Sequence, residues 1–440
     1  MKRVDTAEVH LWDREIGAVA WDSDRQIGHF EFAERFLGSG IELAPLMMPL
    51  GRAIFSFPEL NRVTFQGLPG MLSDSLPDRF GNLLIDRWLA GQGRKAKDFS
   101  PVERLCYVGD RGMGGLEFFP AMKGTPTGSE PLEVQQLVRL ANEALAEKGR
   151  LQTWLDEGAE ATEQADALRE IIQVGTSAGG ARAKAVIAWN PETGEIRSGQ
   201  THEKQGYEPW LIKFDGVAEN RDKELADPLG YGRIEFAYHL MAREAGILMS
   251  DCRLIEENGR AHFLTRRFDR ALEGRKIHFQ SLCAIGHFDF NLAGETSYEQ
   301  AIQTMRRLRL PRADFEQQFS RTVFNLVARN QDDHTKNIAF LMERDGSWRL
   351  SPAYDVIFAY NPSGKWTGSH QMSVNGKRDD FELEDLLDFA EFSSIRNRQA
   401  KSLISRIEEA VARWPEFAAE AGVEEERIEA IGDCFRRFLI

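Results

Sequence analysis

Three side chains late in the chain have the types and the order that phosphoryl transfer requires. Asp332 and Asn337 lie in one polar segment, and Asp355 follows after a stretch that predicts a hydrophobic hairpin. One carboxylate can orient or deprotonate a hydroxyl, while the amide and the second carboxylate can hold the Mg²⁺ that bridges the phosphates. Polar clusters at the end of a helix are also common as caps and turns. The surrounding elements must therefore decide between the two interpretations.

The predicted elements before this segment place further candidate residues. A helix over 314–330, apolar along one face, leads the chain directly to Asp332. Lys213 ends an apolar strand, and Glu235 lies in the apolar stripe of a helix, where an unpaired carboxylate is costly. Kinases use such a lysine–glutamate pair to hold the α and β phosphates of a nucleotide. A lone lysine at a strand end more commonly extends to solvent.

A glycine-rich segment from Gly175 to Lys184 lies between two predicted strands. Backbone N–H groups in such a turn can converge on a phosphate. Gly175 to Gly179 also match the GxSxG pattern of an α/β-hydrolase nucleophile. That pattern requires a helix directly after it, whereas 186–189 predict a strand. Taken alone, the glycines favour a plain hairpin turn.

Composition excludes several classes of protein. The 440 residues, with 42% hydrophobic residues and a mean hydropathy of −0.41, are typical of a soluble protein of two or three domains. No apolar run is long enough to cross a bilayer, and residues 1–16 have no secretory leader pattern. A net charge of −14 argues against a whole surface built for nucleic acid. Four cysteines without CxxC spacing argue against a zinc site or disulfide framework and predict a cytoplasmic protein.

In this order, the motifs resemble the HipA family of serine/threonine kinases, the toxin halves of bacterial toxin–antitoxin pairs. The resemblance covers nearly the whole chain, and its specificity comes from several short motifs in the right sequence. These motifs are Asp332-x-His334-x-Lys336-Asn337, Tyr354-Asp355, Arg267-Phe268-Asp269-Arg270, Ile212-Lys213, Leu76-Pro77-Asp78, the strand around His10-Leu11-Trp12, and Gln371 to Lys377.

The resemblance implies an α/β (α+β) protein-kinase-like fold. Its parts would be a small strand-rich N-terminal domain, an α/β N-lobe and an all-α C-lobe. The corresponding ranges are 1–125 for the N-terminal coupled subdomain, 126–170 for a linker with helices, 171–270 for the kinase N-lobe and 271–440 for the helical C-lobe.

The resemblance also implies roles for individual residues, with ATP and Mg²⁺ as cofactors. Asp332 would be the base or orienter of the substrate hydroxyl, with His334 and Lys336 beside it in the catalytic loop. Asn337 and Asp355 would bind Mg²⁺. The residues expected at the nucleotide are Ala178, Gly179, Gly180, Ala181, Arg182, Ala183, Lys184, Lys213, Glu235, Arg266, Arg267, Phe268, His334, Asn337, Tyr354 and Asp355.

Ser177 falls where the family carries an autophosphorylated serine, and Thr176 is a neighbour that could be modified instead. Two residues depart from the family pattern. Asp333 stands where the family usually has glycine, and we expect it to raise the pKa of Asp332 or to perturb magnesium affinity. Arg266 replaces an acidic or neutral hinge residue, so adenine contacts there would rest on main-chain atoms.

The function implied by the resemblance is an ATP-dependent protein kinase that phosphorylates a host protein, arrests growth and is inactivated by autophosphorylation. In relatives the substrate can be an aminoacyl-tRNA synthetase. A separate HipB-like helix-turn-helix antitoxin is the implied partner, with DNA bound mainly through it and no membrane contact. Two alternatives remain open: a catalytically weak or dead co-repressor, and a small-molecule kinase or Asp/His phosphohydrolase.

Overall fold

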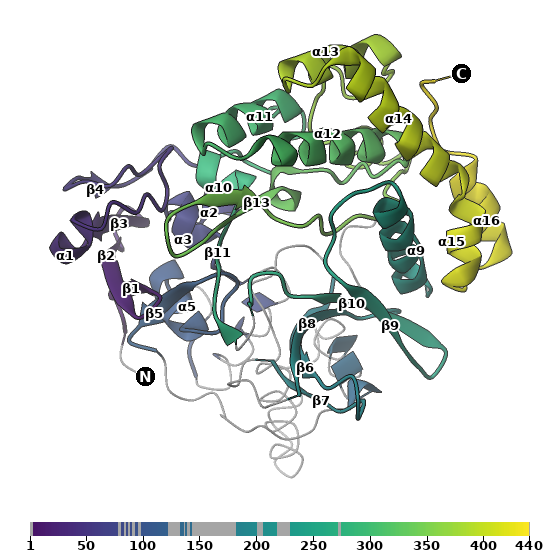
Figure 1. Ribbon diagram of the computed structural model, residues 1–440. Helices are drawn as coiled ribbons and strands as arrows, with labels where there is room; N and C mark the ends of the chain where they lie inside the picture. The colour runs from purple at the N-terminus through teal and green to yellow at the C-terminus, as the bar shows by residue number, and fades with distance from the viewer. Residues whose placement is uncertain are drawn as a thin grey trace. The chain divides into compact units, whose positions relative to one another are not determined.

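The computed structural model describes residues 3–77, 98–121, 182–199, 206–217, 229–271 and 274–439, together with parts of 81–95 and 133–142. Chain contacts divide the protein into two compact, discontinuous units (Figure 1). The first unit comprises 1–39, 51–231 and 253–278, and the second comprises 40–50, 232–252 and 279–440. The predicted domain boundaries near 125 and 170 lie outside the described residues and stay predictions.

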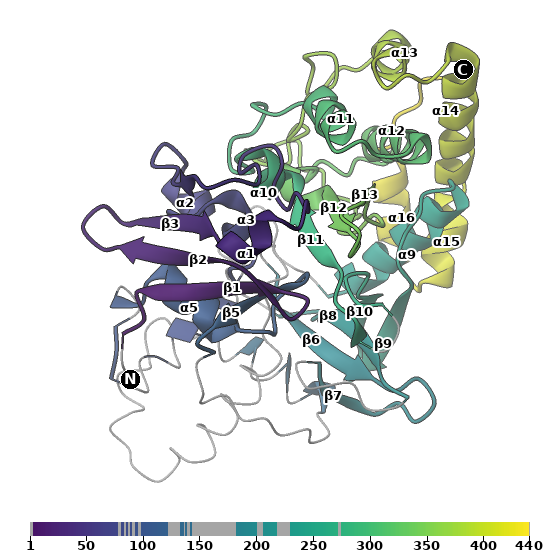
Figure 2. The same ribbon diagram turned by 60° about the vertical axis from the view of Figure 1, so that its left-hand side comes forward.

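The first unit begins with a five-stranded antiparallel sheet in the order β4-β3-β2-β1-β5. Figure 2 shows its strands β3, β2 and β1 side by side. Its strands are β1 (Thr6–Leu11), β2 (Arg14–Asp22), β3 (Ile27–Phe32), β4 (Ile54–Phe55) and β5 (Leu116–Phe119). Buried residues alternate along β1 and β3, so one face of the sheet packs on helix α5 (Pro101–Val108). Short helices α1 (Glu34–Leu37), α2 (Arg62–Phe65) and α3 (Gly70–Ser73) connect the strands. The strand expected around His10 and Leu11 is confirmed as β1.

A second antiparallel sheet of the first unit carries the lysine strand. Its order is β7-β6-β8-β10-β9, with strands β6 (Lys184–Trp189), β7 (Ile196–Ser198), β8 (Glu208–Lys213), β9 (Cys252–Glu257) and β10 (Arg260–Arg266). Ala185, Ile187, Trp210, Ile212 and Leu264 form its buried core. Because β8 lies between β6 and β10, Lys213 is held between two neighbouring strands at the edge of this core.

The second unit is mainly helical (Figure 1). Its helices are α9 (Tyr231–Glu244, of which Tyr231 belongs to the first unit), α10 (Leu282–Gly286), α11 (Tyr298–Arg307), α12 (Arg312–Val327), α13 (Leu383–Phe392), α14 (Asn397–Ala412), α15 (Trp414–Glu420) and α16 (Glu425–Gly432). None of the helices in the described ranges is long and apolar enough to span a membrane.

The prediction of an all-α segment over 271–440 was wrong, because a three-stranded sheet crosses it. The sheet has the order β11-β12-β13, with β11 at His278–Ser281, β12 at Ala339–Met342 and β13 at Trp348–Leu350. Strand β12 is buried along its whole length, so its apolar run forms a strand of the core rather than a helix. The β12–β13 pair is the hairpin predicted between Asn337 and Asp355, and it places these two residues at its two ends.

Candidate active site

The polar segment after helix α12 is fixed at both of its ends. Arg329 has a positive φ of 54°, which turns the chain away from the helix axis. Asn330 then donates through Nδ2 to Asn325 Oδ1 at 2.9 Å. Further along, the Thr335 hydroxyl donates to the Phe288 carbonyl at 2.9 Å, and a single 3₁₀ turn, η3 (Thr335–Asn337), leads into β12. The catalytic loop predicted from the sequence is therefore an ordered, anchored structure.

Asp332 presents a partly exposed carboxylate at the centre of this loop. The Trp366 indole donates to Asp332 Oδ1 at 2.6 Å, and His334 Nε2 lies 3.8 Å from the same oxygen. The side chain is 35% exposed, so one part of the carboxylate remains accessible to a substrate. Burial raises the pKa of Asp332, while His334 and the Trp366 hydrogen bond oppose the rise. A raised pKa suits a carboxylate that accepts a proton near neutral pH.

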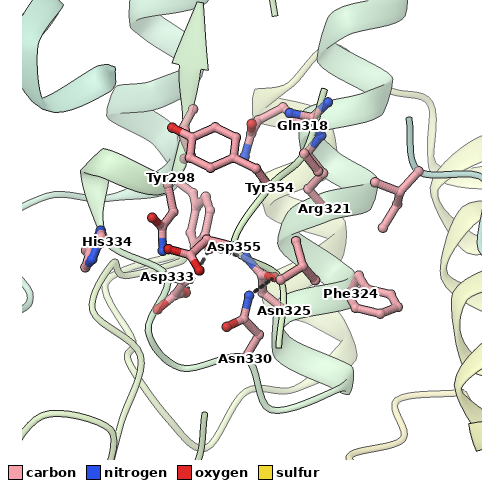
Figure 3. Close-up of a pocket in the computed structure, with 15 residues that line it drawn as sticks. Tyr298, Gln318, Arg321, Phe324, Asn325, Asn330, Asp333, His334, Tyr354 and Asp355 are labelled. Atoms are coloured by element: carbon pink, nitrogen blue, oxygen red, sulfur yellow. Dashed lines mark hydrogen bonds between the residues drawn. The ribbon is translucent and has the colours of Figure 1, made fainter. Parts of the chain in front are cut away.

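Asn337 and Asp355 meet at one hollow, which His334 and Tyr354 also line (Figure 3). The hollow is partly open to solvent. Asn337 donates through Nδ2 to the Asp332 carbonyl at 2.8 Å, which orients the amide. Asp355 has a positive φ of 55°, an unfavourable conformation for a residue with a side chain and one often found at functional sites.

Asp333 lines the same hollow, and its carboxylate lies buried in a cluster of hydrogen-bond donors. Figure 3 shows it beside Tyr298 and Asn325, and the Tyr298 hydroxyl donates to Asp333 at 2.8 Å. Although burial raises the pKa of Asp333, His370 and the other donors hold it below its ordinary value. Its charge contributes to raising the pKa of Asp332, as expected, but after the contributions of burial and of Asp355.

The predicted nucleotide-binding lysines lie in the first unit, on one face of the second sheet. Lys184 and Lys213 are direct cross-strand partners, and both are buried. Partners that face each other across an antiparallel pair project from the same side of the sheet. The Arg182 guanidinium lies 4.4 Å from the centre of the Tyr231 ring. Ala183, which follows Arg182 in the chain, is buried. The structure therefore brings two cations of the predicted phosphate site together.

The predicted hinge residues are largely engaged within the protein. Arg266 pairs with Glu208 at 3.5 Å. Arg267 forms a two-point ion pair with Asp269, at 2.9 and 2.7 Å, and donates to the Gly112 carbonyl at 3.2 Å. The predicted roles of Arg266, Arg267 and Phe268 at adenine stay predictions, and the structure adds a clear structural role for the arginine of the R-F-D-R motif.

Of the remaining residues predicted at the site, the structure describes Glu235 and Lys336 but not those of the glycine-rich segment before Arg182. In the second unit, Glu235 is buried on α9, and the Lys336 ammonium lies 4.8 Å from the Phe290 ring. Thr176, Ser177, Ala178, Gly179, Gly180 and Ala181 lie outside the described residues. The structure thus collects His334, Asn337, Tyr354 and Asp355 at one hollow of the second unit, and it pairs Lys184 with Lys213 within the first unit.

Comparison with known proteins assigns the chain. Residues 176–414 match the model of the HipA-like C-terminal domain, and residues 7–119 match that of the HipA N-terminal domain. The first match alone covers more than half of the chain. The chain belongs to the HipA family.

Two relatives extend the likeness of this HipA family member over nearly its full length. A Sinorhizobium fredii protein named "Putative kinase Y4mE" is 25% identical over 446 residues, covering 96% of this chain and 95% of its own. A chain from the solved Shewanella oneidensis MR-1 toxin–antitoxin complex of HipA, HipB and operator DNA superposes with a TM-score of 0.68 at 17% identity. That match covers 97% of this chain and 95% of the other, and it shows a shared fold.

Sequence reasoning missed several residues that shape this HipA site. Trp366 bonds Asp332, while His370 and Tyr298 bond Asp333. The motif beginning at Gln371 was recognised without a role, and its first backbone N–H proves to donate to Asp333 Oδ1 at 2.7 Å. None of these side chains is adjacent to the loop in sequence. The nearness of Trp366 to the motif at Gln371 was the one sequence signal that could have suggested a role for it at the site.

Proposed function

We propose that this HipA family member is an ATP-dependent protein serine/threonine kinase. The observation that carries the proposal is the meeting of Asn337 and Asp355 at one hollow, with the Asn337 amide bonded to the main-chain carbonyl of Asp332. This is the set of groups that phosphoryl transfer requires, in a loop that is anchored at both ends. The kinase name of the Sinorhizobium relative supports the same reading.

In the proposed reaction Asp332 receives the proton of the substrate hydroxyl. The hydroxyl oxygen forms a bond to the γ-phosphorus, and the bond from that phosphorus to the β–γ bridging oxygen breaks, which releases ADP. The Trp366 indole keeps Asp332 Oδ1 in place at 2.6 Å and leaves the other carboxylate oxygen for the incoming hydroxyl. His334, whose Nε2 lies 3.8 Å from Asp332 Oδ1, would contact the substrate.

The residues present fit a magnesium ion. Mg²⁺ binds proteins through one or two oxygen ligands and takes the remainder from water and phosphates. The Asn337 amide uses its nitrogen for the Asp332 carbonyl, and in the described part of the chain its Oδ1 accepts no hydrogen bond. Asn337 Oδ1 and the Asp355 carboxylate would hold the ion, which would offset phosphate charge. Lys184 and Lys213 would hold the nucleotide phosphates.

We extend the proposal to regulation and partners. Phosphorylation of Ser177, in the predicted phosphate loop, would add about two negative charges where the ATP phosphates bind and so inactivate the enzyme. The proposed substrate is a host protein, with an aminoacyl-tRNA synthetase as the first candidate, and its modification would arrest growth. The Shewanella complex contains HipB and operator DNA, so a HipB-like antitoxin that contacts DNA is the proposed partner.

Purified protein incubated with Mg²⁺ and γ-labelled ATP tests the proposal. We expect label on the protein itself and on a protein substrate, and we expect Asp332→Ala to abolish both. Asp24→Ala is a matched control, because this carboxylate lies in an exposed turn far along the chain from the site. Folded wild-type protein that transfers no label, yet binds an antitoxin on DNA, would instead identify a co-repressor. The burial of Asp333 among donors favours the active enzyme.

A further inference from the structure

Asp333 is a carboxylate of the catalytic loop that the proposed reaction does not use. Its side chain is only 1% exposed, and it accepts hydrogen bonds from the Tyr298 hydroxyl at 2.8 Å, from the Gln371 backbone N–H at 2.7 Å and from His370 Nδ1 at 2.8 Å. A buried carboxylate with this many donors tolerates little displacement, since each lost bond leaves a charge poorly compensated. These hydrogen bonds therefore fix Asp333 in place, and with it the backbone next to Asp332.

His370 links Asp333 to the C-terminal segment, because its ring contacts both Asp333 and Arg436. Arg436 Nη1 lies 3.1 Å from His370 Nε2. Arginine can only donate, so Nε2 must accept and we assign the ring proton to Nδ1, where it faces the Asp333 carboxylate. Asp333, His370 and Arg436, linked in this order, form what we call the tail network.

The C-terminal segment that carries Arg436 is itself well held. The Arg436 backbone N–H donates to the Val327 carbonyl at 2.9 Å, at the end of helix α12. Its guanidinium pairs with Asp379 and lies 5.2 Å from the Phe381 ring. Arg329, at the start of the catalytic loop, donates to the Cys434 carbonyl at 2.8 Å. The C-terminal segment thus contacts helix α12, which leads into the catalytic loop, and His370, which bonds Asp333.

The segment between Trp366 and Gln371 completes the arrangement. Trp366 donates to Asp332, and the Gln371 backbone donates to Asp333. The Arg378 guanidinium donates to the His370 carbonyl at 2.6 Å, which ties this segment to the chain beside Asp379. Displacement of His370 would therefore move donors of both consecutive carboxylates.

We propose that Asp333 is a positioning residue for Asp332 and that the tail network makes the geometry of the catalytic loop depend on the C-terminal segment. The proposal rests on the proposed function for its catalytic consequence. The geometric part, a loop held by Arg436 through His370, stands independently of any activity. A partner or modification that displaced the tail would then lower turnover without touching the nucleotide.

Three variants test the tail network: D333N, R436M and their combination. D333N keeps the shape of the side chain but turns a donor toward His370 Nδ1–H. The ring can relieve this conflict by moving its proton to Nε2, which then faces the Arg436 guanidinium. R436M removes the guanidinium and with it this donor–donor conflict. D333N should therefore lower kcat less in the R436M background than in the wild type. R437M is the control, because Arg437 is the adjacent arginine, is exposed and lies outside the tail network.

The first readout is steady-state kinetics at a temperature well below the melting point. We expect D333N and R436M each to lower kcat by ~10-fold, since small misplacements of catalytic groups cost this much or more, with the KM for ATP changed by less than ~2-fold. The double variant should lose less than the product of the two single effects, and R437M should match the wild type. Effects that multiply, or single variants with wild-type kcat, would overturn the proposal.

The second readout separates this proposal from the proposed function. Hydrogen exchange of the peptide spanning 331–338, measured without ATP, should become faster in D333N and R436M and stay unchanged in R437M. Faster exchange in a protein whose wild type transfers no phosphate would support the tail network while refuting the kinase. Unchanged exchange and unchanged kcat in an active R436M enzyme would refute the tail network while leaving the kinase intact.

Discussion

Replacing Asp269 by asparagine should destabilise the first unit strongly, because this carboxylate holds two arginines inside the protein. Asp269 is fully buried, and the side chains of Arg267 and Arg270 are only 2% and 9% exposed. The carboxylate accepts from Arg267 at 2.9 and 2.7 Å, from Arg270 at 2.7 Å and from the Gly114 backbone N–H at 2.7 Å. Asn keeps the shape but removes the charge that both guanidinium groups require.

The magnitude follows from these contacts. Removing one partner of a buried ion pair costs about 3–5 kcal/mol, since the other charge stays buried without compensation. Arg267 and Arg270 would still donate to the Gly112 carbonyl, and Arg270 to that of Gly114, which favours the lower end, about 3 kcal/mol. The loss is a large share of the stability of an ordinary domain.

The pH dependence has a definite sign. Burial alone would raise the pKa of Asp269, but Arg267 and Arg270 hold it well below its ordinary value of 3.8. A carboxylate with a depressed pKa stabilises the folded state fully above its unfolded pKa and loses this effect as the pH falls below it. The difference between wild type and D269N should therefore be largest at pH 7 and smaller by about 1 kcal/mol at pH 3.

Urea unfolding followed by circular dichroism at both pH values measures these differences, and hydrogen exchange of β5 and β10 reports on the first unit alone. D5N is the matched control, because Asp5 pairs with Arg3 at a site where its side chain is 55% exposed and such pairs contribute little. A D269N protein as stable as the wild type, or a difference that does not change with pH, would refute this account of the R-F-D-R motif.

Three further predictions concern the site. D332N and D355N should each lower phosphate transfer by at least ~100-fold with an unchanged circular dichroism spectrum, and an active variant of either kind would contradict the assignment. W366F should raise the pKa of Asp332, because the indole hydrogen bond opposes the rise; the acidic limb of the kcat–pH profile should move to higher pH, and an unmoved limb would show that Asp332 is not the titrating base. S177A should carry no phosphate on its tryptic peptide after incubation with ATP, and its activity should stay constant where that of the wild type falls; modification of Thr176 with the same loss of activity would move the switch by one residue.

Local patterns were sufficient to predict many of the elements. The apolar face of the 314–330 segment predicted the helix that ends at Val327, and the apolar run after Asn337 predicted the β12–β13 hairpin. Lys213 was placed correctly at a strand end. These predictions succeeded because helical and strand periodicities depend on neighbours a few residues away. The all-α prediction for 271–440, which came from the family resemblance, failed because this range holds the β12–β13 hairpin and β11, a strand distant in sequence that pairs with β12.

The sequence by itself determined the family and the order of the candidate groups Asp332, Asn337 and Asp355, since residue types and their spacing in short motifs carry that information. Only the tertiary structure decided what Asp333 does, because its donors His370 and Tyr298 lie 37 and 35 residues away and Arg436 a further 66 beyond His370. Whether a carboxylate perturbs a neighbour or anchors a loop depends on which donors surround it after folding. No local pattern encodes those donors, because burial and hydrogen bonding are set by segments that meet only in the folded chain.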